Sequence, residues 1–92
     1  MIADQSDLSV VDVGFGNIIP SRRIVGIVAY DSDPMRRHCQ ELEKKLRLID
    51  ATRGRKVRSV VILDSEQVVL SNVNRETLAE RFQTAVGKSP QI

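Results

Sequence analysis

Short apolar runs rich in β-branched residues recur along the chain, separated by glycine, proline or polar clusters. Runs of this length and composition predict β-strands. The run at 23–29 is nearly continuous in apolar residues, which predicts a strand buried on both faces. Asp64-Ser65-Glu66 separates the last two runs and predicts a hairpin turn between them. The predicted strands are 8–13, 23–29, 48–52, 57–63 and 67–73.

Two segments have helical periodicity instead. In the first, Asp33 is the expected N-cap and Pro34 suits the first helical position. The apolar residues that follow recur at spacings of four, three and four, which places them on one helix face: Met35, Cys39, Leu42 and Leu46. The second helix is expected to begin after a cap at Asn74, with an apolar stripe formed by Leu78, Phe82 and Ala85.

The order strands, helix, strands, helix predicts an α+β fold. We expect a small β-rich single domain, residues 8–86, built from antiparallel strands and hairpins with two helices. The polar ends, 1–7 and 87–92, are expected to be flexible termini.

Gly14-Phe15-Gly16-Asn17 interrupts the first apolar region and predicts a tight turn or bulge, with Phe15 as a hydrophobic plug. A nucleotide-binding role is disfavoured, because Ile19 stands where the dinucleotide fingerprint has its third glycine. The lysine of a P-loop is also missing.

Composition narrows the class of protein. The single cysteine, Cys39, rules out an internal disulfide and favours a reducing, cytoplasmic location. No apolar run reaches the roughly 18 residues that a membrane span requires, and the acidic N-terminus does not resemble a signal peptide. The aromatic fraction of 3% argues against recognition of nucleic acid by base stacking.

Catalytic, metal and cofactor chemistry have little support. His38 and Cys39 are adjacent, so on a helix their side chains diverge by about 100°, and a zinc site needs about four ligands. No nucleophile is marked as a partner of His38. We therefore expect no enzyme activity, no metal and no small-molecule cofactor.

Positive charge is concentrated in the middle of the chain. The net charge of +2 divides into −3 for residues 1–20, +6 for residues 21–58 and −1 for residues 59–92. Four cations fall within six positions around Gly54, between two apolar runs: Arg53, Arg55, Lys56 and Arg58. A turn that holds like charges together is typical of a surface that binds a polyanion, most commonly nucleic acid.

Several details favour phosphate binding over a merely solvated hairpin tip. Lys56 and Arg58 are expected to point the same way, because side chains alternate along an extended chain. Gly54 permits close approach of a phosphate to the backbone, and arginine can bridge a phosphate with two hydrogen bonds. Arg22 and Arg23 are candidates for the same surface.

Neighbouring charges raise two further expectations. Asp50 and Asp64 flank the turn and are expected to pair with its arginines. Arg36 and Arg37 occupy the first turn of the first helix, where the macrodipole disfavours cations. Either an acid across a subunit interface or a phosphate offsets that cost, or both side chains are simply exposed.

A set of short motifs resembles one known family over about residues 9–82. The motifs are Gly-Phe-Gly-Asn-Ile at 14–18, Arg-Ile at 23–24, Pro34 with following cations, Leu-Ile-Asp-Ala-Thr at 48–52, Gly-Arg at 54–55, Arg58, Asp64-Ser65, Val-Val-Leu-Ser at 68–71, Glu76-Thr77 and Arg81-Phe82. In this order and spacing they resemble the RemA family, the bacterial extracellular matrix regulatory proteins.

The resemblance implies a LytTR-like fold, assembly into ring-shaped homo-oligomers, and regulation of biofilm-matrix and osmoprotection genes through double-stranded DNA. By motif match, the DNA-contacting positions are Arg23, Arg55 and Lys56. The chain departs from the family where Lys56 replaces an arginine, Arg53 a tyrosine and Val57 a threonine. The segment Pro-Ser-Arg before Arg23 also replaces Ser-Ala-Asn.

Two hypotheses follow. The first is a cytoplasmic, nucleoid-associated transcription regulator whose cations at positions 22, 23, 53, 55, 56 and 58 contact DNA phosphates around a homo-oligomeric ring. The alternative is an oligomeric scaffold that binds an acidic protein partner through the same basic patch.

Overall fold

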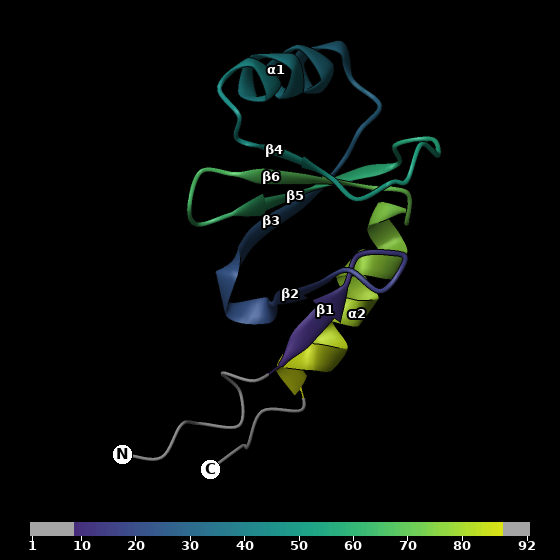
Figure 1. The fold of residues 1–92 in the computed structure, drawn as a ribbon. Helices are drawn as coiled ribbons and strands as arrows, with labels where there is room; N and C mark the ends of the chain where they lie inside the picture. The colour runs from purple at the N-terminus through teal and green to yellow at the C-terminus, as the bar shows by residue number, and fades with distance from the viewer. Residues whose placement is uncertain (1–8, 88–92) are drawn as a thin grey trace.

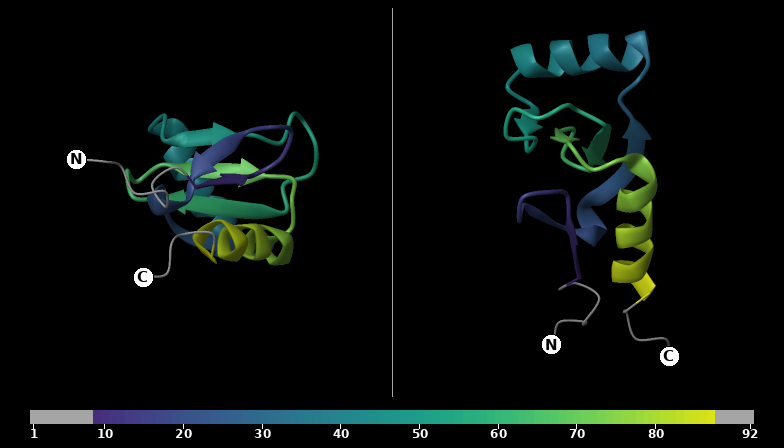
Figure 2. Two further views of the ribbon diagram at one scale, coloured as in Figure 1. Left: turned by 90° about the horizontal axis from the view of Figure 1, so that it is seen from below. Right: turned by 90° about the vertical axis from the view of Figure 1, so that its right-hand side faces the viewer.

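The computed structural model describes residues 9–87 as one domain of three layers (Figure 1). A four-stranded sheet forms the middle layer and helix α1 (Asp33–Lys44) covers one of its faces. The other face is covered by the hairpin of β1 (Val10–Asp12) and β2 (Ile18–Pro20) together with helix α2 (Arg75–Gly87) (Figure 2). The predicted α+β class with two helices is therefore confirmed.

The middle sheet has the strand order β3-β5-β6-β4. Its strands are β3 (Ile24–Ala29), β4 (Leu48–Asp50), β5 (Ser59–Leu63) and β6 (Val68–Ser71). β5 pairs antiparallel with both β3 and β6, whereas β4 runs parallel to β6, with Leu48 opposite Val68. The prediction of purely antiparallel hairpins was wrong at this one pair. A 3-10 turn, Ser21–Arg23, links β2 to β3.

The core is divided between the two faces of the sheet. Alternation along β5 sends Val60 toward α1 and Val61 toward the hairpin and α2. Two buried serines tie the layers together: Ser71 Oγ donates to the Val13 carbonyl at 2.6 Å, and Ser59 Oγ donates to the Val73 carbonyl at 2.6 Å. Both hydroxyls are thus paired, which removes most of the cost of burying them.

The edge strand β3 corrects a prediction. Its run of apolar residues predicted burial on both faces, but Val25 is 65% exposed. The register shift between Ile24 and Gly26 interrupts the pairing with β5 at that point, so the residue between them is left at the open edge of the sheet.

The N-cap of the first helix lies one residue earlier than predicted. Ser32, not Asp33, is the N-cap, and its hydroxyl accepts a hydrogen bond from the Met35 amide at 3.2 Å. Cys39 is buried and Leu42 packs beside it as predicted, but Leu46 lies beyond the helix with a left-handed φ of 58° and is 88% exposed. The helix stops at Lys44, so the last apolar residue does not reach the core.

The second helix follows the prediction. The Asn74 side chain accepts a hydrogen bond from the Thr77 amide at 2.8 Å, and Leu78 and Ala85 are buried while Phe82 packs against them. Gly87 is the last residue of α2, so it does not belong to a flexible tail. The predicted flexible ends at 1–7 and 88–92 lie outside the described residues. Neither helix is long and apolar enough, within residues 9–87, to cross a membrane.

Candidate nucleic-acid interface

The basic loop, residues 53–58, connects β4 to β5 at one end of the sheet, which we call the loop end (Figure 1). All four of its cations are exposed. Hydrogen bonds fix both sides of the loop: the Arg55 amide donates to the Thr52 carbonyl at 3.0 Å, and the Arg58 amide donates to the Ser71 carbonyl at 2.8 Å. The Asn72 side-chain amide also donates to the Lys56 carbonyl at 2.8 Å. The cations therefore project from an anchored backbone.

The turn inside the loop depends on left-handed backbone conformations. Arg53 has φ of 54° and Gly54 has φ of 80°. Glycine adopts this region without a steric cost, whereas arginine does not. The predicted role of Gly54 as the residue around which the chain turns is consistent with these angles.

Asp50 braces the base of the loop and does not pair with its arginines. Its Oδ1 accepts hydrogen bonds from the Thr52 amide at 2.9 Å and from the buried Thr52 hydroxyl at 2.6 Å. Asp64 pairs with Arg23 instead, at 2.8 Å. The expectation that these two acids pair with the arginines of the turn was wrong, because local turn bonds and strand order decide their partners.

None of the four basic-loop cations forms an ion pair with any residue between 9 and 87. The three ion pairs in that part of the chain are Arg23–Asp64, Arg36–Asp33 and Arg47–Glu66, at 2.8, 3.2 and 2.9 Å. All three are exposed, so each is screened by water. Among residues 9–87, no carboxylate pairs with the basic loop to cancel its positive field.

Arg22 and Arg23 lie at the opposite end of the sheet, which we call the turn end because it carries the β5–β6 turn. The Asp64 amide donates to the Arg23 carbonyl at 3.0 Å, which fixes Arg23 beside that turn. Strand β5 has five residues, so at about 3.3 Å per residue it separates the two ends by roughly 17 Å. One subunit therefore does not bring Arg22 and Arg23 onto the same surface as the basic loop.

Two aromatic side chains that were not predicted to belong to the site lie at the loop end. Phe15, at the tip of the β1–β2 hairpin, lies against the guanidinium groups of Arg53 and Arg55 at 5.4 and 5.8 Å from the ring centroid. It is 44% exposed, so it is not the hydrophobic plug that was predicted. Its partners are 38 and 40 positions away in sequence, and no local pattern could have indicated the contact.

Tyr30 extends the loop end toward α1. Its amide donates to the Arg58 carbonyl at 3.2 Å, and the Arg36 guanidinium lies 5.9 Å from its ring centroid. Arg36 also pairs with Asp33, which offsets the unfavourable position of a cation in the first turn of a helix. Arg37 is exposed.

The groups considered for metal or thiol chemistry are separate from this surface. Burial raises the pKa of the Cys39 thiol, which keeps it protonated and packed 4.0 Å from the Met35 sulfur. Among residues 9–87, no three His, Cys, Asp or Glu side chains gather in a group that could hold a metal ion.

Comparison with known proteins places the chain in a family. Residues 10–82 match the RemA-like family, described as extracellular matrix regulatory protein A-like. A protein of Moorella thermoacetica and one of Clostridium acetobutylicum are each 46% identical over 78 residues, covering 85% of this chain and 86% and 85% of their own lengths. A protein of Cyanothece is 45% identical over 76 residues, covering 83% of this chain and 84% of its own. All three bear the name "Putative regulatory protein". With the family match spanning most of the chain and relatives this similar, the protein belongs to the RemA-like family of regulatory proteins.

Proposed function

We propose that the protein is a DNA-binding transcription regulator that holds duplex DNA by its phosphates through the basic loop. The observation that carries the proposal is the set of four exposed cations on an anchored loop, none paired with a carboxylate between residues 9 and 87. A rigid, uncompensated cluster of this kind favours a polyanion. Membership of a family of regulatory proteins makes DNA the fitting polyanion.

The contacts divide into a primary and a secondary group. Arg53, Arg55, Lys56 and Arg58 are the primary phosphate contacts. Arg22 and Arg23 are secondary, because they lie at the turn end and Arg23 is held by Asp64. Within residues 9–87, neither helix extends beyond the basic loop at the loop end (Figure 1), so affinity is expected to depend on phosphates and on DNA shape more than on base edges.

About four phosphate contacts from one subunit give weak and strongly salt-dependent binding, since each neutralised phosphate contributes about 0.9 to the salt slope. Repetition of the basic loop around a homo-oligomeric ring would raise the affinity through effective concentration. A ring needs two different, complementary surfaces on each subunit. The two open edges of the sheet supply candidates.

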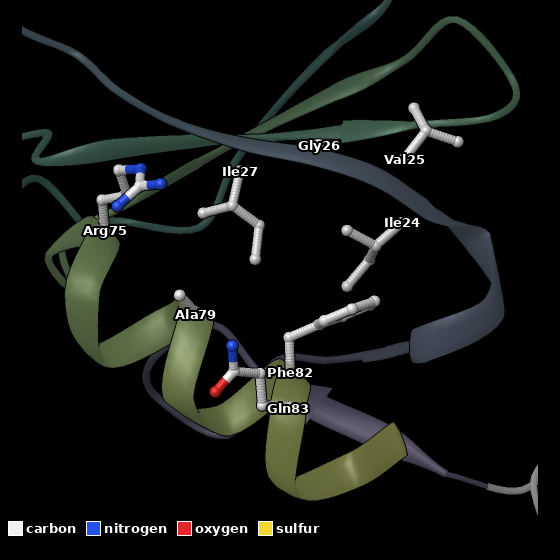
Figure 3. A pocket seen from close by; sticks show the side chains of 8 residues that line it. All are labelled: Ile24, Val25, Gly26, Ile27, Arg75, Ala79, Phe82 and Gln83. Atoms are coloured by element: carbon white, nitrogen blue, oxygen red, sulfur yellow. The ribbon is translucent and has the colours of Figure 1, made fainter. Parts of the chain in front are cut away.

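The first candidate surface is the β3 edge. Val25 is 65% exposed there, beside a groove of about 240 Å³ between β3 and α2 (Figure 3). Ala79 and Phe82 of α2 form the apolar wall opposite Ile24 and Ile27, and the Arg75 guanidinium lies at one end. An apolar groove beside an unpaired strand edge is typical of an interface.

The second candidate surface is the β4 edge, on the opposite side of the sheet. Ile18 of β2 is 59% exposed and Ile49 of β4 is 45% exposed, and both line a groove of about 240 Å³. Asp50 lines this groove, whereas Arg75 lines the one at the β3 edge. Apolar surface and opposite charge thus support a head-to-tail contact between β3 of one subunit and β4 of the next.

The likeness to LytTR domains, the control of biofilm-matrix and osmoprotection genes, and a cytoplasmic, nucleoid-associated location complete the proposal. They rest on the resemblance to the RemA family. The alternative, a scaffold that binds an acidic protein, uses the same cations and is separated from DNA binding by experiment.

The test is a titration of labelled duplex DNA at about 50 and about 200 mM salt, followed by fluorescence anisotropy, with light scattering for the mass of the complex. We expect saturable binding that weakens at least tenfold at the higher salt. Arg55→Ala should weaken DNA binding relative to the wild type without changing the melting temperature. Arg47→Ala removes the same charge at the turn end and should leave DNA binding unchanged. A monomer that does not bind DNA at low salt would exclude the proposal.

A further inference from the structure

Phe15 contacts two cations of the basic loop from a separate part of the chain. The guanidinium carbons of Arg53 and Arg55 lie 5.4 and 5.8 Å from the centroid of its ring. Both distances fall within the roughly 6 Å range of a cation–π contact. Phe15 belongs to neither of the two apolar clusters of the described residues and remains 44% exposed. Its ring is therefore committed to the arginines and not to the core.

The backbone around Phe15 is built to hold the ring in this place. The Val13 amide donates to the Asn17 carbonyl at 2.8 Å, and the Asn17 amide and side chain donate to the Gly14 carbonyl at 3.0 and 2.9 Å. Phe15 itself has φ of 55°, a conformation that costs a non-glycine residue stability. The facing residue, Arg53, has φ of 54°. Strain of this kind tends to collect at binding sites.

We propose that Phe15 is a positioning residue for DNA binding: its ring holds the guanidinium groups of Arg53 and Arg55 together so that they meet the phosphates as a pair. This inference rests on the proposed function and names Phe15 as the residue that orders the arginines of the basic loop.

Two effects oppose such a pair in the absence of the ring. Guanidinium groups repel one another, and long side chains lose rotamer freedom when they bind. A cation–π contact uses the flat face of the guanidinium and leaves its N–H donors free for phosphate oxygens. The ring thus reduces the cost of ordering without competing with DNA for the donors.

The first experiment compares Phe15→Leu with Phe15→Tyr. Leucine keeps an apolar side chain and the same backbone requirement but removes the aromatic face, whereas tyrosine keeps the face. Phe15→Leu is expected to weaken DNA binding about five- to thirtyfold, as for two exposed cation–π contacts. Phe15→Tyr should bind as the wild type does, and both variants should melt within a few degrees of it.

A double-mutant cycle separates positioning from direct contact with DNA. In a protein that carries Arg53→Ala and Arg55→Ala, the further change Phe15→Leu is expected to have no effect on affinity or on the salt slope. An equal loss in both backgrounds would mean that Phe15 contacts DNA itself and would overturn the inference. So would wild-type affinity of Phe15→Leu in the otherwise unchanged protein.

A readout without DNA keeps this inference distinct from the proposed function. In the wild type, the side-chain protons of Arg53 and Arg55 should show upfield ring-current shifts by NMR, and Phe15→Leu should abolish them. Absence of those shifts in the wild type would overturn the inference even if DNA binds. If the shifts are present and the wild type does not bind DNA, the proposed function fails and the role assigned to Phe15 fails with it.

Discussion

Arginines lie at both ends of the sheet, but these arginines differ in whether they are paired with an acid. At the loop end, Arg53 and Arg55 lie on an aromatic ring with no carboxylate partner among residues 9–87. At the turn end, Arg23 and Arg47 are each paired with an acid of the β5–β6 turn, Asp64 and Glu66. The difference teaches that a count of cations does not identify a binding surface. What matters is which cations the fold leaves without acids.

The largest expected effect comes from removing charge at the loop end. Arg55→Ala combined with Lys56→Ala should weaken DNA binding about 100-fold, because each charged hydrogen bond contributes about 1.5 kcal/mol or more. The salt slope should fall by about 1.8. The matched control is Arg22→Ala combined with Arg23→Ala, which removes the same charge at the turn end and should cost less than about threefold. Anisotropy titrations at several salt concentrations measure both. Equal losses of DNA affinity in the two double variants would show that the two ends do not differ in DNA binding.

A smaller effect on DNA affinity is expected when the proposed assembly of subunits, which repeats the loop end, is prevented. Val25→Asp puts a charge on the exposed β3 edge, where a neighbouring subunit is proposed to dock, and should reduce the mass seen by light scattering. DNA affinity should then fall about tenfold or more, since avidity is lost. Leu46→Asp is the control, because Leu46 is 88% exposed outside both grooves. An unchanged mass for Val25→Asp would show that β3 is not an interface.

At the turn end, releasing Arg23 sharpens the comparison further. Asp64→Asn removes the partner of Arg23 and should raise DNA affinity about two- to threefold if the ion pair is what withholds this arginine from phosphates. The cost in unfolding free energy should stay below about 1 kcal/mol, as for an exposed ion pair. Combining Asp64→Asn with Arg23→Ala should cancel the gain. A gain that persists in that double variant would come from the lost negative charge alone.

The smallest expected effect is on stability and comes from Cys39, which lies away from both ends of the sheet. Burial raises the pKa of Cys39 above its ordinary value near 9.0. The unfolded chain therefore releases this proton at a lower pH than the folded one, and stability should begin to fall as the pH rises past about 9. Urea unfolding at pH 8 and pH 10 would measure the slope, and Cys39→Ala should reduce it. If that slope is the same in both proteins, the thiol makes no contribution.

Sequence patterns predicted the elements better than their partners. Asn74 as a helix cap and the stripe of Leu78 and Ala85 depend on residues three or four positions apart, and the structure has both. The parallel pairing of β4 with β6 depends on contacts between segments 20 positions apart, which periodicity does not encode. Leu46 shows the related limit that an apolar residue at helical spacing does not extend a helix that ends at Lys44.

The candidate site divides in the same way. The basic loop was recognisable because its cations are neighbours in sequence and the glycine among them marks a turn. Phe15 and the acid partners were not, because Phe15 reaches Arg53 across layers and Asp64 reaches Arg23 across a strand pair. Sequence therefore located the charges, and the topology decided which of them are neutralised.

The left-handed backbone at Arg53 sets the stability of the fold against the DNA-binding role proposed for this residue. Glycine or asparagine at that position would relieve the conformational penalty and so stabilise the fold, but either would delete a charge from the proposed DNA-binding surface. A chain selected only for thermal resistance would drift toward the smaller residue. An arginine at this position therefore makes the domain less stable but adds a charge to the proposed DNA-binding surface.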